Sequence, residues 1–157
     1  MNDNPYAPPE APVTDVESPI SLDRPPIVVL AVRLLWGGFA VGFVSSIYGL
    51  FTLPENVPKA FVAIFTLVGL AIAFAISYGI FTAAWRGRGW ARWVIAALVV
   101  LAVAIVGGMW AFLPRAPVFP WQTTAAFVIR MTFYITAIVM LFSPTANAWY
   151  REMKRWR

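Results

Sequence analysis

One charged side chain, Arg130, lies near the middle of a long apolar stretch. At membrane depth an arginine costs about 2.5 to 3.5 kcal/mol by insertion scales unless its charge is relieved. Arg130 is expected either to reach toward a membrane surface or to bind an anion or a partner's acid, and both interpretations stay open. Hydroxyls are the available intramembrane partners, so Arg130, Tyr48 and Ser77 form the predicted intramembrane polar site.

A basic turn, Trp85-Arg86-Gly87-Arg88-Gly89-Trp90-Ala91-Arg92-Trp93, separates two other apolar stretches. Its arginines cannot lie in hydrocarbon, so the turn marks a membrane surface. Basic residues return near the carboxy terminus, and both groups are expected to contact anionic lipid headgroups. The predicted headgroup contacts are Arg86, Arg88, Arg92, Arg151, Lys154 and Arg155.

Several kinds of chemistry lack the residues that they need. The chain has no cysteine and no histidine, and no aspartate or glutamate interrupts an apolar stretch. The usual ligands for transition metals and the usual groups for proton relays and acid–base pairs are therefore missing. Phosphate-binding glycine loops and serine-nucleophile motifs are also lacking. The sequence predicts no cofactor, no metal and no catalytic residue, and so favours a non-enzymatic protein.

The composition is that of an integral membrane protein. Of 157 residues, 61% are apolar and 12% are charged, which is too apolar for a soluble domain of this size. Four apolar segments, about 27–53, 60–85, 91–113 and 123–142, are each long enough to cross about 30 Å of hydrocarbon. The predicted fold is an all-α membrane protein with four transmembrane helices in an up-down bundle spanning 27–142.

Two flanking segments differ from this domain. Residues 1–26 contain seven prolines and five acids and are predicted to be a disordered cytoplasmic tail. Two PxxP patterns in the tail leave a docking motif open as an alternative. Residues 143–157 begin with Ser143-Pro144, a good helix start, and place Ala146, Trp149 and Met153 on one side. They predict a basic amphipathic helix at the membrane interface, with a frayed tail as the alternative.

Basic residues in the loops predict the orientation, because they are retained on the cytoplasmic side. One side holds the basic turn, both chain ends and most of the basic residues, whereas the other holds only Lys59 and Arg115. Both termini are therefore predicted to be cytoplasmic, with the protein in a bacterial inner membrane. An aromatic belt on the cytoplasmic side would contain Trp85, Trp90, Trp93 and Trp149.

Small residues recur every four positions in the first two helices. The first has Gly38, Gly42 and Ser46, and the second has Gly69 and Ala73 followed by Ser77. Such stripes allow two helices to approach closely. The sequence predicts a tight hairpin between these two helices, with a homodimer seam as the alternative.

Three motifs carry a family resemblance: Asn4-Pro5-Tyr6-Ala7-Pro8-Pro9, the turn from Gly87 to Trp93, and Leu141-Phe142-Ser143-Pro144. With them the chain resembles a loose group of small uncharacterised four-helix inner-membrane proteins of proteobacteria. The resemblance implies location and fold but no activity.

The function predicted from the sequence is that of a non-enzymatic inner-membrane protein acting through helix and lipid contacts, as an accessory, regulatory or immunity-type subunit. The alternative is a small transporter or channel component that functions as an oligomer. The expected partners are anionic lipids and another membrane protein or a second copy. Nucleic acid is not expected, because the basic residues cluster at the ends of apolar segments.

Overall fold

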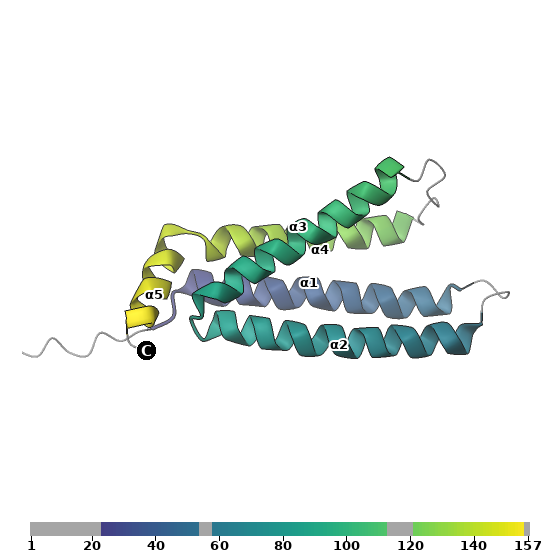
Figure 1. Cartoon of the computed structure of the whole chain (residues 1–157), viewed down its shortest axis with the longest axis horizontal. Helices are drawn as coiled ribbons and strands as arrows, with labels where there is room; N and C mark the ends of the chain where they lie inside the picture. The colour runs from purple at the N-terminus through teal and green to yellow at the C-terminus, as the bar shows by residue number, and fades with distance from the viewer. Residues whose placement is uncertain (1–22, 54–57, 113–120, 156–157) are drawn as a thin grey trace, which may run out of the picture.

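The computed structural model describes residues 23–53, 58–112 and 121–155, and within these ranges the chain is all helical (Figure 1). The helices are α1 (Pro26–Phe51), α2 (Lys59–Trp85), α3 (Gly89–Phe112), α4 (Trp121–Leu141) and α5 (Pro144–Arg155). Four of them, α1 to α4, are long and apolar enough to cross a membrane. The all-helical class and the four helices of membrane-spanning length and composition are thus confirmed. The PxxP patterns and most of the predicted tail lie outside the described residues.

The turn between α2 and α3 is shorter than predicted, because α3 already begins at Gly89. The N–H of Arg88 donates to the carbonyl of Ala83 at 2.9 Å, and the N–H of Gly87 donates to that of Ala84 at 3.1 Å. Gly87 has a φ of 74°. These two hydrogen bonds and the left-handed glycine form a Schellman motif, which ends α2 and reverses the chain within three residues.

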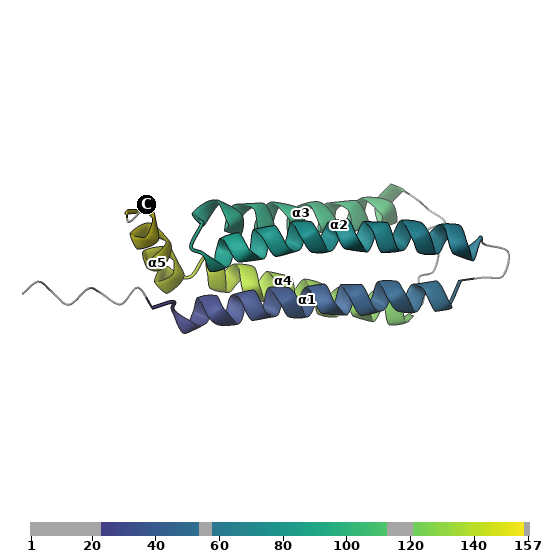
Figure 2. The ribbon, with the colours of Figure 1, turned by 90° about the horizontal axis from the view of Figure 1, so that it is seen from below.

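The four long helices form two layers, α1 with α4 and α2 with α3 (Figure 2). Each helix contacts its two neighbours around a square, and the contact between α1 and α4 is the most extensive. The helix α3 diverges from the rest of the bundle with distance from α5 (Figure 1). Chain entry into α1 and the helix α5 lie at the same end of the bundle, which we call the α5 end.

The prediction that the small residues of α1 pack closely against those of α2 is wrong, because they face α4. A Cβ added to Gly38 would lie 2.7 Å from Cε1 of Tyr134 on α4, whereas a Cβ added to Gly69 on α2 would meet nothing within 4 Å. The glycines of α1 accommodate large side chains of α4, so no second small-residue stripe is required. Ala73 is exposed, and the Ser46 hydroxyl donates to the Gly42 carbonyl of its own helix at 2.9 Å.

The buried core is concentrated at the α5 end. All five helices contribute to it, and its members are Val28, Ala31, Leu35, Phe81, Ala83, Ala84, Ala91, Ile95, Ala137, Leu141, Ala146, Trp149 and Tyr150. Farther along α2, by contrast, large apolar side chains such as Phe65 are more than half exposed. Apolar surface of this extent fits a helix that faces lipid or a partner helix.

Candidate functional site

The short helix α5 packs across the end of the bundle. Its Trp149 and Tyr150 are only 5% and 3% exposed, and the Tyr150 hydroxyl donates to the Ala84 carbonyl at 3.0 Å. Ser143 caps the helix, accepting a hydrogen bond from the Ala146 N–H at 3.3 Å. The predicted amphipathic helix is present, but its apolar side contacts protein. Trp149 was therefore wrongly placed in the aromatic belt.

The α2–α3 turn fits closely against α5. A Cβ on Gly87 would lie 2.9 Å from Cγ of Met153 and 3.2 Å from Cη2 of Trp149. Glycine is thus required at position 87 for two reasons: its φ is positive, and the close contact with α5 leaves no room for a Cβ. The turn and α5 together form one surface at the end of the bundle.

A side-chain bridge ties α3 to α5. Nη1 of Arg92 donates to Oδ1 of Asn147, and Nδ2 of Asn147 donates to the Phe142 carbonyl at 2.9 Å. The guanidinium carbon of Arg92 also lies 5.1 Å from the ring centroids of both Phe142 and Tyr150, within range of cation–π attraction. Arg92 is therefore held in a fixed position by the protein.

A groove of about 420 Å³ lies between the turn and α5. We call it the basic groove; its lining residues are Gly87, Arg88, Gly89, Trp90, Arg92, Trp93, Tyr150, Arg151 and Lys154. Four of the six predicted headgroup residues therefore meet in one place. The other two lie apart: Arg86 lines a neighbouring pocket together with Asp23, and Arg155 is exposed outside the groove.

The electrostatics of the basic groove favour an anion. It is lined by four cationic side chains and, among the described residues, by no acid. Trp90 and Trp93 on its rim are 51% and 63% exposed, and amphipathic indole rings are suited to the headgroup region of a membrane. A phosphate group in this groove would meet several positive charges and aromatic edges at once.

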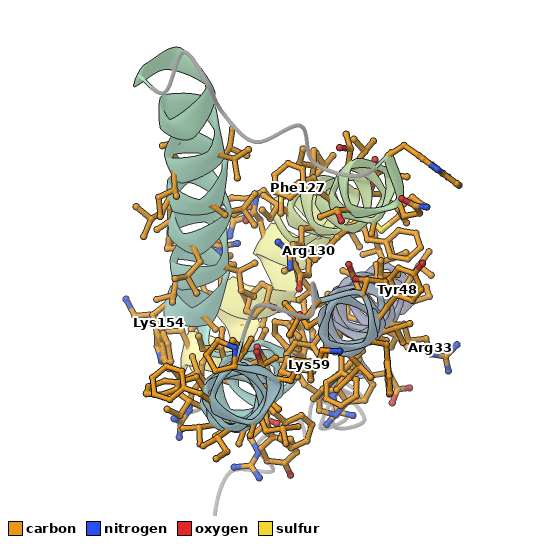
Figure 3. The ribbon with its side chains drawn as sticks, turned by 90° about the vertical axis from the view of Figure 1, so that its right-hand side faces the viewer. Arg33, Tyr48, Lys59, Phe127, Arg130 and Lys154 are labelled. Carbon is orange, nitrogen blue, oxygen red and sulfur yellow. The ribbon has the colours of Figure 1, made fainter. Side chains whose placement is uncertain are left out.

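Arg130 marks a second candidate site, at mid-length of α4. Figure 3 shows its side chain pointing from α4 into the space among the four long helices. Its Nε is buried and has no hydrogen-bond acceptor among the described residues. The guanidinium carbon lies 5.7 Å from the ring centroid of Phe127. The side chain crosses α1 at Gly42, where a Cβ would come within 2.9 Å of Nη1.

The Arg130 cavity, of about 170 Å³, is lined by all four long helices. Ser77 of α2 and Tyr134 of α4 line it together with Arg130, and its other lining residues are apolar. Tyr48, the third member of the predicted polar site, lies elsewhere: it is 53% exposed, and it lines an outer groove of α1 and α4 that includes Trp121. The structure brings Arg130 and Ser77 together in one cavity, whereas Tyr48 lines a different groove. Figure 3 shows Tyr48 apart from Arg130.

No protein family model, curated protein or solved structure matches this chain. The two sites are therefore interpreted from their own geometry and chemistry.

Two residues of these sites, Tyr134 and Asn147, were not predicted from the sequence. Tyr134 follows Arg130 by four positions, a spacing that places both side chains on one face of a helix. This spacing could have identified Tyr134 as a neighbour of Arg130 from the sequence. Asn147 gave no comparable signal, because its partner Arg92 is 55 positions away in the chain.

Proposed function

We propose that this chain is a non-enzymatic, multi-pass membrane protein that binds anionic lipid headgroups in the basic groove. The observation that carries the proposal is the convergence of Arg88, Arg92, Arg151 and Lys154 on one groove that no described acid lines. Scattered surface charges would attract anionic lipid only diffusely. A groove that gathers four cations, with Arg92 held in place by Asn147, offers one headgroup several charge-assisted hydrogen bonds at once.

In this proposal the protein acts as an accessory or regulatory subunit, with lipid at its α5 end and a partner on its exposed helices. The partner is another membrane protein or a second copy, and the outward face of α2 offers the apolar surface for it. The resemblance to the proteobacterial group supports an inner-membrane location.

We further propose that the α5 end is cytoplasmic, as the distribution of basic residues favours. Among the described residues, Lys59 is the only basic residue at the opposite end. A periplasm-active reporter fused after Arg157 should be inactive. Strong activity of that fusion would reverse the orientation.

Lipid retention tests the groove. Native mass spectrometry of the detergent-purified chain, with phosphatidylglycerol and phosphatidylcholine added in equal amounts, should show preferential retention of phosphatidylglycerol. Lys154→Gln should weaken this preference several-fold, because Lys154 lines the groove. Arg155→Gln is the matched control: it removes the same charge from the adjacent position, outside the groove. Equal losses in the two variants would show that net charge, and not the groove, binds lipid.

The alternative function, a small transporter or channel component working as an oligomer, is supported by one observation, the Arg130 cavity within the bundle. Flux of a small anion through the purified protein in liposomes would favour it. A specific co-purifying partner without flux would favour the accessory function.

A further inference from the structure

We propose that the Arg130 cavity binds a small monovalent anion, held by the Arg130 guanidinium and by the hydroxyls of Ser77 and Tyr134. This inference concerns a site separate from the basic groove and goes beyond the lipid-binding function proposed above. The two sites lie on different parts of the bundle: the groove is lined by the α2–α3 turn, α3 and α5, and the cavity by the inner faces of α1 to α4.

Charge is the first reason for an anion. The sequences of α1, α2, α3 and α4 contain no aspartate or glutamate, so no carboxylate of these helices can neutralise Arg130. Nε of Arg130 is buried without an acceptor among the described residues. A guanidinium nitrogen that is shielded from water needs a hydrogen-bond acceptor, and the charge is stabilised by a nearby counter-charge. An anion in the cavity supplies both.

The lining chemistry is the second reason. Ser77 and Tyr134 both have hydroxyls that can donate hydrogen bonds. A guanidinium and two hydroxyl donors can surround a small anion, which accepts several hydrogen bonds at once. The rest of the lining is apolar, including Leu35, Ile95 and Met131. In such a setting the electrostatic attraction between an anion and Arg130 is stronger than in water.

Size and location decide the class of ligand. A cavity of about 170 Å³ accommodates several water-sized groups but is too small for a phospholipid headgroup with its glycerol. All four long helices line it, so a ligand there would be held among the helices of this chain. The fitting class is therefore a small monovalent anion, whether inorganic, as chloride or nitrate, or a carboxylate, as formate.

Glycine at position 42 makes this arrangement sterically feasible. Cδ of Arg130 would lie 3.0 Å from a Cβ on Gly42, and Nη1 would lie 2.9 Å from it. Any larger residue would force the arginine side chain to move. Gly42 thus acts as a positioning residue, because it fixes the path by which the guanidinium enters the cavity.

The test uses the full chain in detergent and follows the NMR line width of chloride, which broadens when chloride exchanges with a protein site. At constant ionic strength, with gluconate as the non-binding replacement, the wild type should show excess broadening that formate or nitrate displaces. Arg130→Gln should remove this broadening. Displacement by formate alone or by nitrate alone would distinguish a carboxylate site from an inorganic one.

Two controls separate this site from others. Arg33→Gln removes an exposed arginine on α1, and Lys154→Gln removes a cation of the basic groove. Both should keep the displaceable broadening. Its loss in Lys154→Gln but not in Arg130→Gln would overturn the proposal while leaving the lipid groove intact. The absence of displaceable broadening in the wild type would overturn it directly.

Milder variants cover the case in which Arg130→Gln fails to fold. Ser77→Ala and Tyr134→Phe each remove one hydroxyl donor, and each should weaken anion binding by about tenfold, the usual effect of losing a hydrogen bond to a charged group. Unchanged chloride affinity in both variants would contradict the assigned ligands.

Discussion

The Arg130 guanidinium occupies the space beside Gly42 that a larger residue would fill: a Cβ on that glycine would lie 2.9 Å from Nη1 of the arginine. Four residues earlier in α1 and four later in α4, Gly38 and Tyr134 make the same kind of contact, at 2.7 Å. The two residue pairs lie on successive turns of the antiparallel helices α1 and α4. The glycines of α1 therefore both allow α4 to pack closely and leave the space that the Arg130 side chain occupies.

The first prediction concerns this helix pair. Gly38→Ala should lower the free energy of unfolding by about 1 to 3 kcal/mol, because the Tyr134 ring must move to admit the new methyl group. Thermal unfolding in detergent measures the change. Gly69→Ala is the control: its methyl group meets nothing within 4 Å, so it should not destabilise the protein and, inside a helix, should raise the free energy of unfolding by about 0.5 to 1 kcal/mol. A loss of stability in Gly69→Ala as large as that in Gly38→Ala would show that α2, and not α4, is the close partner of α1.

The second prediction concerns the turn against α5. Gly87→Ala combines a positive φ, which costs about 1 to 2 kcal/mol for other residues, with a contact of 2.9 Å to Cγ of Met153. It should loosen α5, seen as faster amide hydrogen exchange across 144–155. Gly89→Ala, two positions away with nothing within 4 Å, should leave exchange unchanged. Equal exchange in the two variants would mean that the turn does not hold α5.

The third prediction tests the bridge between α3 and α5. Asn147→Ala removes the acceptor for Arg92 and the donor to the Phe142 carbonyl. Leaving the Arg92 charge without its partner should cost about 1 to 3 kcal/mol of unfolding free energy. Thr145→Ala changes an exposed residue of the same helix and should be nearly neutral. If both variants unfold like the wild type, Asn147 contributes nothing to docking.

The fourth prediction concerns alkaline pH. Burial raises the pKa of Tyr150 to about 12 from its ordinary value of 10.0, although the nearby Arg92 acts in the opposite direction. Above pH 10 an undocked Tyr150 ionises while the docked one stays neutral, so the docking of α5 should weaken as pH rises from 10 toward 12.

Ultraviolet absorbance measures this titration. The difference between the wild type and Tyr150→Phe isolates one phenol, and its midpoint should fall near 12. A midpoint near 10 would show that the ring is exposed to solvent.

Sequence alone predicted the helices well and their neighbours poorly. Hydropathy located the four long helices, and Ser143-Pro144 located the start of α5, because these signals are local. The stripe of Gly38 and Gly42 indicated a close approach but not its partner, since a small residue accommodates either another small residue or a large side chain. Tyr48 was grouped with Arg130 by polarity alone, whereas the rotation of α1 turns it outward.

The apolar side of α5 was also ambiguous in the sequence. Ala146 and Trp149 form a face that suits lipid and protein equally, and only the arrangement of the bundle shows that protein covers it. The basic groove arises from this docking, because it brings Arg151 and Lys154 to the turn that carries Arg88.

Photocrosslinking to a phosphatidylglycerol with a photoreactive headgroup, followed by peptide mapping, tests the basic groove most directly. The label should map to residues 87–93 and 150–154, and it should fall sharply in a variant carrying both Arg88→Gln and Lys154→Gln. Labelling spread evenly to the end that carries Lys59, or undiminished in that variant, would contradict a lipid site in the groove.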